Sequence, residues 1–223
     1  NPTVPDCTFS GNMAQSGSGM ANVRSSPTVT NCTFGGNSAA SSGGGMYNVT
    51  SSKPTVIRTT FRGNTAIGSA ESPGTGGAVF NESGSDLVAM NCSFIGNVAN
   101  FAGGMFNSDS SPILNNCTFG GNSAIGSIAF PGLTGGGMLN ANVSLPSIGN
   151  CILWDNSPNQ IFNLSLDVAV PFITHSNVQG GLPSGTTDGG GNIDADPMFA
   201  DVNLRLSAGS PCINAGDPAV LFV

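Results

Sequence analysis

The sequence predicts an all-β fold, a parallel β-helix of about seven to eight coils with a period near 25 residues. Three observations favour this fold. Two short segments recur in alternation along the chain, as in a solenoid. Runs rich in Val, Thr, Phe and Ile alternate with Gly, Asn, Pro and Ser, which is typical of strands and turns. No stretch has the 3.6-residue apolar period of a helix.

The first repeated segment predicts one corner and one inward face of each coil. It reads NCTFGGNSAA at 31–40 and NCTFGGNSAI at 116–125. Cys and the Phe two residues later share a face of a strand, whereas the Asn before Cys tolerates the left-handed backbone of a corner. The aligned column holds Cys7, Cys32, Thr59, Cys92, Cys117 and Cys151. A second corner is expected at Asn12, Asn37, Asn64, Asn97 and Asn122. Like residues then stack in successive coils, including the core column Phe34, Phe61, Phe94 and Phe119.

The second repeated segment carries two adjacent apolar columns. It reads GGGMYN at 43–48 and GGGMLN at 135–140. Neighbours on a strand face opposite sides, so only one column enters the core. The uniform Met column is predicted inside. The aromatic column with Tyr47, Phe80 and Phe106 is predicted to face outward as an interaction surface, or to lie under a loop.

Two long insertions, 67–76 and 125–135, interrupt the repeat at the same place. They are predicted to leave the rod at one corner, two coils apart, with the short connection 98–103 between them. Loops are the most individual surface of a repeat protein. We therefore expect a ligand or a lateral contact on this side, with Phe101, Phe130 and Leu133 as contact residues.

Composition narrows the class of protein. Of 223 residues, 33 are Gly, and 8% are charged, with a net charge of −7 and five Lys+Arg. The negative charge argues against nucleic acid as a partner. The apolar stretches are too short for a membrane span.

One solenoid domain is expected, with repeated coils over 1–175 and a closing coil, C-terminal segment and apolar tail over 176–223. The chain opens inside a repeat, so a trimmed N-terminus is expected.

The cysteine column allows two interpretations. Adjacent coils bring Cys7 near Cys32 and Cys92 near Cys117, within the Cα range of a disulfide. Side chains on in-register strands run side by side, however, and Cys packs as a small hydrophobe. We favour a reduced internal ladder. Cys212 lies outside the column and receives no predicted partner.

These repeats resemble the right-handed parallel β-helix superfamily that includes pectate lyase. The GGAVFN motif at 76–81 and the FxGN segments are similar to chlamydial polymorphic membrane proteins, which are surface-exposed adhesins. Residues 176–218, with GNIDADPMFADVNLRLSAGSPCINAGDP, resemble the closing segment of large secreted bacterial β-helix proteins. The resemblance implies an extracellular or cell-surface location. It does not imply one activity, because the superfamily holds lyases, hydrolases, adhesins and spacers.

The residues offer no convincing catalytic constellation. Polysaccharide lyases on this fold need a cation and a base, and hydrolases need two carboxylates about 5–9.5 Å apart. The lone His175 has no repeated acid beside it and is interpreted as a corner or surface residue. One acidic cluster is a weak candidate for Ca²⁺, with turn and cap roles as the alternative. It comprises Asp188, Asp194, Asp196 and Asp201. No other cofactor is expected.

The sequence thus predicts an extracellular structural or adhesive module, with a surface glycan or protein as ligand. A carbohydrate-binding or polysaccharide-cleaving β-helix is the alternative. End-to-end self-association into filaments is also expected, because open strand edges invite further pairing. The tail would pair with the first coil of the next subunit. The residues predicted at this contact are Val4, Cys7, Phe9, Val220, Leu221, Phe222 and Val223.

Overall fold

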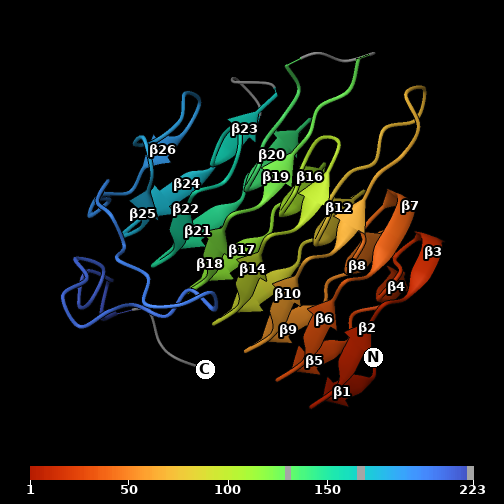
Figure 1. The fold of residues 1–223 in the computed structure, drawn as a ribbon, viewed down its shortest axis with the longest axis horizontal. Helices are drawn as coiled ribbons and strands as arrows, with labels where there is room; N and C mark the ends of the chain where they lie inside the picture. Colours follow the sequence, from red (N-terminus) through yellow and green to blue (C-terminus); the bar gives the residue numbers. More distant parts are fainter. Residues whose placement is uncertain (129–131, 165–168, 220–223) are drawn as a thin grey trace.

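The chain folds into a parallel β-helix, as predicted (Figure 1). The computed structural model describes residues 1–128, 132–164 and 169–219. The first coil contains β1 (Thr3–Pro5), β2 (Thr8–Ser10), β3 (Met13–Ser16) and β4 (Met20–Val23). Each of these begins one of four parallel sheets, here named A to D. A coil therefore has four sides, and the two predicted corners lie between sheets A and B and between sheets B and C.

The later strands extend the four sheets in chain order. Sheet A continues with β5 (Thr28–Thr30), β9 (Thr55–Ile57), β13 (Val88–Met90), β17 (Ile113–Asn115), β21 (Ser147–Gly149), β24 (Phe172–Thr174) and β26 (Thr187–Asp188). Sheet B continues with β6 (Thr33–Gly35), β10 (Thr60–Arg62), β14 (Ser93–Ile95), β18 (Thr118–Gly120), β22 (Ile152–Trp154) and β25 (Asn177–Val178). Sheet C adds β7 (Ser38–Ser42), β11 (Thr65–Ala66), β15 (Val98–Ala99) and β19 (Ser123–Ala124). Sheet D adds β8 (Met46–Val49), β12 (Val79–Glu82), β16 (Met105–Ser108), β20 (Met138–Ala141) and β23 (Ile161–Asn163).

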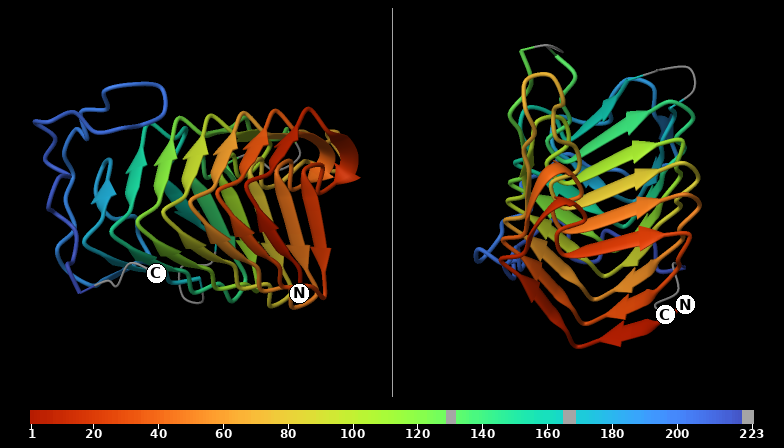
Figure 2. Two further views of the ribbon diagram at one scale, coloured as in Figure 1. Left: turned by 90° about the horizontal axis from the view of Figure 1, so that it is seen from below. Right: turned by 90° about the vertical axis from the view of Figure 1, so that its right-hand side faces the viewer.

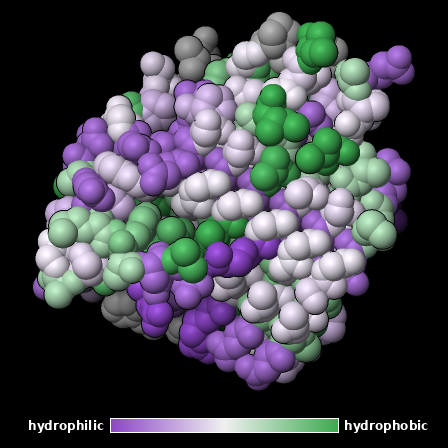
Figure 3. Space-filling model, in the orientation of Figure 1, coloured by the Kyte–Doolittle hydropathy of each residue, from purple (hydrophilic) through white to green (hydrophobic). Residues whose placement is uncertain are grey.

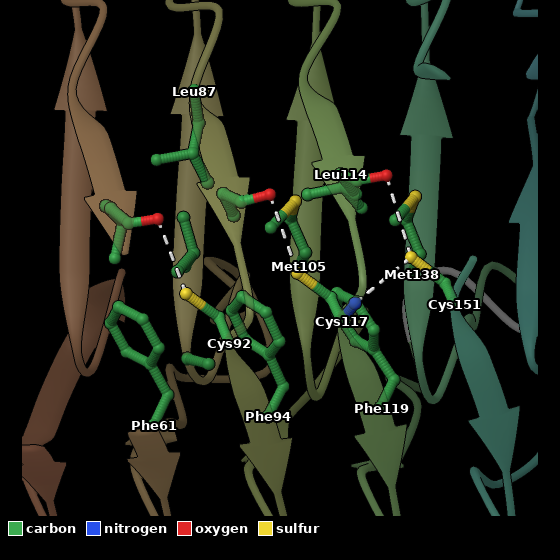
Figure 4. Packing of buried hydrophobic residues seen from close by; sticks show 14 of the residues in the cluster. Phe61, Leu87, Cys92, Phe94, Met105, Leu114, Cys117, Phe119, Met138 and Cys151 are labelled. Carbon is green, nitrogen blue, oxygen red and sulfur yellow. Dashed lines mark hydrogen bonds between the residues drawn. The ribbon is translucent and has the colours of Figure 1, made fainter. Parts of the chain in front are cut away.

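The predicted core column is confirmed. Phe34, Phe61, Phe94 and Phe119 are fully buried and lie in register on sheet B. Their rings stack nearly parallel, with centroids 4.8, 5.1 and 4.2 Å apart, and Figure 4 shows Phe61, Phe94 and Phe119 of this column. The Met column of sheet D belongs to the same buried cluster, in which Met46, Met105 and Met138 are fully buried.

The corner between sheets A and B is held by a ladder of γ-heteroatoms. Asn31 has φ 52° and Arg58 has φ 48°, the left-handed backbone predicted for this corner. Cys32 Sγ accepts from the Cys7 amide at 3.3 Å and donates to the Thr30 carbonyl at 3.2 Å. In the next coil Thr59 Oγ1 makes the equivalent contacts, at 3.3 and 3.0 Å. Each of these positions therefore has a γ-atom that accepts one hydrogen bond and donates another. Thr59 meets this requirement, which explains why it can stand in a column of cysteines.

The six cysteines are free thiols, consistent with the reduced ladder. Burial raises the pKa of the Cys92 and Cys117 thiols well above their ordinary value. Both therefore remain protonated and poorly nucleophilic at neutral pH.

The second corner, between sheets B and C, requires a correction. The left-handed position belongs to the glycine before each predicted Asn, for example Gly36 at φ 62°. The asparagines instead turn inward. Asn37 Nδ2 donates to Asn64 Oδ1 and to the Phe9 carbonyl, both at 2.9 Å. Each amide thus joins three coils, which a corner side chain exposed to solvent would not do.

Two further ladders complete the polar interior. On sheet D, Asn48 Nδ2 donates to Asn81 Oδ1 at 2.8 Å, and Asn81 Nδ2 to Asn107 Oδ1 at 2.9 Å. Between sheets D and A, the Ser52 amide donates to Ser85 Oγ at 3.1 Å. Since buried polar groups are costly unless paired, these ladders fix the register of successive coils.

Residues 194–219 do not add a regular coil. In the left view of Figure 2 this blue segment leaves the end of the stack, and part of it returns along the rod. Arg62 Nη2 donates to Asn203 Oδ1 at 2.9 Å. Leu204 lies over Gly120, where an added Cβ would be 2.4 Å from Leu204 Cδ1. The segment therefore covers part of the outer face of sheet B.

Candidate functional site

The two long loops leave the rod on one side, as the sequence predicted. The first follows β11 and the second follows β19, and β15 lies between them in sheet C. The right view of Figure 2 shows both projecting in the same direction. We call this side the two-loop face, comprising the described residues of 67–76, 98–103 and 125–135.

One buried side chain fastens both loops. Asn100 lies on the coil between them and is 9% exposed. Its Oδ1 accepts from the Gly68 amide at 3.0 Å and the Gly74 amide at 2.8 Å, at the two ends of the first loop. Its Nδ2 donates to the Gly126 carbonyl of the second loop at 3.1 Å. The loop bases are therefore positioned relative to each other by direct hydrogen bonds.

The two-loop face exposes isoleucines that the sequence reasoning did not single out. Ile67, Ile125 and Ile128 are 46, 57 and 95% exposed. Figure 3 shows hydrophobic residues gathered over this part of the molecule. A sequence signal was present: Ala66 and Ala124 belong to the inward alanine column, so the next residue on the strand must face outward.

The predicted contact residues of the loops have different environments. Phe101 is half-buried and packs with Ala102 and Leu139. Leu133 is half-buried. Phe130 lies outside the described residues. Of the predicted set, Phe101 therefore joins the loop base to the outer face of sheet D.

The aromatic column of sheet D stacks on that outer face. The ring centroids of Tyr47 and Phe80 are 5.1 Å apart, and those of Phe80 and Phe106 are 5.2 Å apart. Phe80 is 6% exposed, whereas Tyr47 and Phe106 are half-buried. Burial, with a smaller contribution from the Glu82 carboxylate, raises the pKa of Tyr47. The column faces outward and is partly covered, which combines the two arrangements that the sequence left open.

A pocket of about 560 Å³ lies where the C-terminal segment meets the corner between sheets A and B. Sequence reasoning missed it because its roof depends on a contact across 67 residues: Asn150 Oδ1 accepts from the Asp217 amide at 2.7 Å. We call it the corner pocket. Its polar lining includes Asn116, Thr118, Asn150, His175, Asn214 and Asp217.

His175 occupies the corner, as predicted, with φ 45°. Its Nδ1 lies 2.8 Å from Thr174 Oγ1. The imidazole also packs on the backbone of Gly191, where an added Cβ would be 2.4 Å from His175 Cδ2.

The predicted acidic cluster is built from separate turns. Asp188 Oδ1 accepts from the Gly190 amide at 2.8 Å, and Asp196 Oδ1 accepts from the Met198 amide at 2.8 Å. Asp194 Oδ1 accepts from the Gly180 amide at 3.2 Å. A hydrogen bond from Arg205 lowers the pKa of Asp201. Within the described ranges, no three His, Cys, Asp or Glu side chains group as metal ligands. Asp188, Asp196 and Asp201 each accept from the amide two residues further along the chain, as in a local turn.

The first coil, at one end of the rod, holds the described part of the predicted assembly contact. Val4, Cys7 and Phe9 are half-buried in the first coil. Strands β1 to β4 each stand at the edge of their sheet. Residues 220–223 lie outside the described residues. In the described part of the chain, no helix is long and apolar enough to cross a bilayer.

The family model described as the right-handed β-helix region matches residues 1–174. The search of curated proteins and the search of solved structures found no significant match.

Proposed function

The chain belongs to the right-handed β-helix family, and on this basis we propose that it is a structural and adhesive module of a secreted or cell-surface protein. In this proposal the coils form a rigid support and the two-loop face contacts the partner, a surface glycan or protein. The observation that carries the proposal is the set of exposed isoleucines on two loops whose bases share one buried Asn. Exposed apolar groups on a fixed support are typical of interaction surfaces.

The rigidity of the support adds to this argument. The asparagine ladders join successive coils by hydrogen bonds of 2.8–2.9 Å. The Asn100 amide hydrogen-bonds the bases of both loops and so fixes them to these coils. A preorganised surface loses less conformational entropy on binding than a mobile one. The extracellular location is supported by the resemblance of the repeats to surface adhesins and of the closing segment to secreted β-helix proteins.

Adhesion can be measured with the whole chain on fluorescent beads. The beads are applied to films of mucin, collagen and fibronectin and to neutral polysaccharide. The test variant combines Ile67→Ser, Ile125→Ser and Ile128→Ser. We expect the wild-type beads to adhere to at least one film and the variant to lose most of that adhesion.

A matched control replaces three exposed apolar residues elsewhere. Ile113, Val143 and Leu145 are 44, 59 and 51% exposed and lie outside the two-loop face. Their replacement by Ser removes similar side chains without touching the loops. Equal adhesion by both variants, or no adhesion by the wild type, would overturn the proposal.

We also propose that the rods associate end to end. The support is the edge position of β1 to β4 in their sheets, because a strand at a sheet edge can pair with another strand. A heterologous contact of this kind extends into a filament unless it closes a ring. Light scattering on the chain with and without residues 219–223 tests the tail. Filaments that are equally long without it would exclude the tail from the contact.

A further inference from the structure

We propose that the corner pocket binds an uncharged, polyhydroxylated molecule about the size of a hexose. This site is separate from the two-loop face, and the inference does not rest on the proposed adhesive function. The pocket volume of about 560 Å³ falls within the usual range for small-molecule sites, about 300–1,000 Å³.

Several polar side chains of the lining are free to bind a ligand. The amides of Asn116 and Asn214, the Thr118 hydroxyl and the His175 Nε2 atom make no hydrogen bond to any residue that the structure describes. An amide offers both donors and acceptors, and a hydroxyl offers both at one atom. A ligand rich in hydroxyl groups matches this mixture, because each hydroxyl also donates and accepts.

The charge of the lining favours a neutral ligand. Among the described lining residues, Asp217 is the one with a carboxylate, and none is Lys or Arg. The whole chain has a net charge of −7. An anionic ligand would therefore enter a negative field without a Lys or Arg of the described lining to pair with, which is unfavourable.

The lining also provides apolar contact. Ile152 and Ile193 come from the last coils, and Leu206 comes from the returning segment. The carbon-bound hydrogens of a sugar or cyclitol ring pack against such side chains, while the ring hydroxyls reach the polar groups. This combination of an apolar wall and a few convergent polar groups characterises ligand pockets.

Both sides of the pocket are fixed by hydrogen bonds before a ligand enters. The roof is held by the paired bonds between Asn150 and the Asp217 backbone, at 2.7 and 3.1 Å. Asn177 Nδ2 also donates to Cys212 Sγ at 3.0 Å. The opposite side is the ladder-bonded corner of the coils, so little ordering remains for binding.

Saturation-transfer NMR and calorimetry on the full chain test the inference. The probes are glucose, galactose and myo-inositol, compared with glucuronate and galacturonate. We expect saturation transfer to at least one neutral compound. The matching uronate should bind at least ~10-fold more weakly, a difference in binding free energy of about 1.4 kcal/mol. No binding by any neutral compound, or tighter binding of a uronate, would overturn the inference.

Two matched variants locate the site. Thr118→Trp fills the pocket from sheet B, whereas Thr33→Trp places the same ring in the same outward column three coils away. Asn116→Asp removes the amide donor and adds charge, with Asn91→Asp as its counterpart on a left-handed corner. We expect Thr118→Trp and Asn116→Asp to weaken binding at least ~10-fold and the controls to leave it unchanged. Unchanged binding in Thr118→Trp contradicts the assignment. The isoleucine variants of the two-loop face should bind the probes normally, so failure of either proposal is distinguishable.

Discussion

The repeated coils and the returning C-terminal segment are held by different kinds of contact. In the coils, each side chain meets its own counterpart one period away, as Phe61 meets Phe94. The segment over 194–219 makes single contacts across long separations, 141 residues for Arg62 and Asn203. Coil contacts reinforce one another along the rod, as in other repeat proteins. The segment contacts do not repeat, so we expect the rod to be stable and the segment to be separable from it.

The largest effect is expected from a core truncation in the coils. Phe94→Ala removes a fully buried ring between two stacked neighbours. We expect a loss of about 3–5 kcal/mol in the free energy of unfolding, from lost burial and from the cavity left behind. Urea denaturation followed by circular dichroism measures it. A loss under about 1 kcal/mol would show that the Phe column does not carry the core.

The next effect compares two asparagines. Asn97 is fully buried, accepts from Asn64 and donates to Asn122 and to the Phe61 carbonyl. Asn97→Ala leaves several of these groups unpaired, so we expect a loss of about 3 kcal/mol. Asn150→Gly removes an amide that binds the returning segment and is expected to cost less than about 1 kcal/mol. The same urea titration measures both losses. Similar losses for the two variants would contradict the claim that the coils and the returning segment contribute differently to stability.

Alkaline pH should weaken the rod through its thiols. Burial raises the folded-state pKa of Cys92 and Cys117 above the ordinary value of 9.0. Below that value both states are protonated, and the stabilisation is fully present. As pH rises further, the unfolded thiols ionise first, so stability falls. The double variant Cys92→Ser, Cys117→Ser keeps the γ-donor and should show a flatter stability profile above pH ~9. If the stability of the double variant falls as steeply with pH as that of the wild type, groups other than these two thiols cause the loss of stability.

The smallest effect concerns the segment alone. Leu204→Ser weakens its packing over Gly120. We expect faster proteolytic cleavage within 196–210, with the urea midpoint of the coils nearly unchanged. The matched variant Val202→Ser, at a residue 74% exposed, should leave cleavage as in the wild type. A shifted urea midpoint for Leu204→Ser would show that the segment unfolds together with the rod, which would contradict a separable segment.

Sequence reasoning succeeded where a contact repeats and failed where it occurs once. The Phe and Met columns and the common origin of the two loops follow from spacing alone. At the second corner, Gly36 and Asn37 both tolerate left-handed backbone, so the spacing did not decide which of them adopts it. In the structure Gly36 adopts it, and the Asn37 side chain turns inward to join the amide ladder. The exposed Ile67 was deducible from its buried neighbour. The corner pocket was not, because nothing in the repeat indicates that Asp217 returns to Asn150.

Native-state hydrogen exchange on the unmodified chain tests the central claim most directly. The ladder-bonded amides of Asn37, Asn64 and Asn97 should exchange only through global unfolding, with one shared free energy. The amides of Leu204 and Ser207, bonded within the returning segment, should exchange at clearly lower free energy through local opening. Equal protection of the two sets, or stepwise loss of protection from coil to coil, would contradict a cooperative rod with a separable segment.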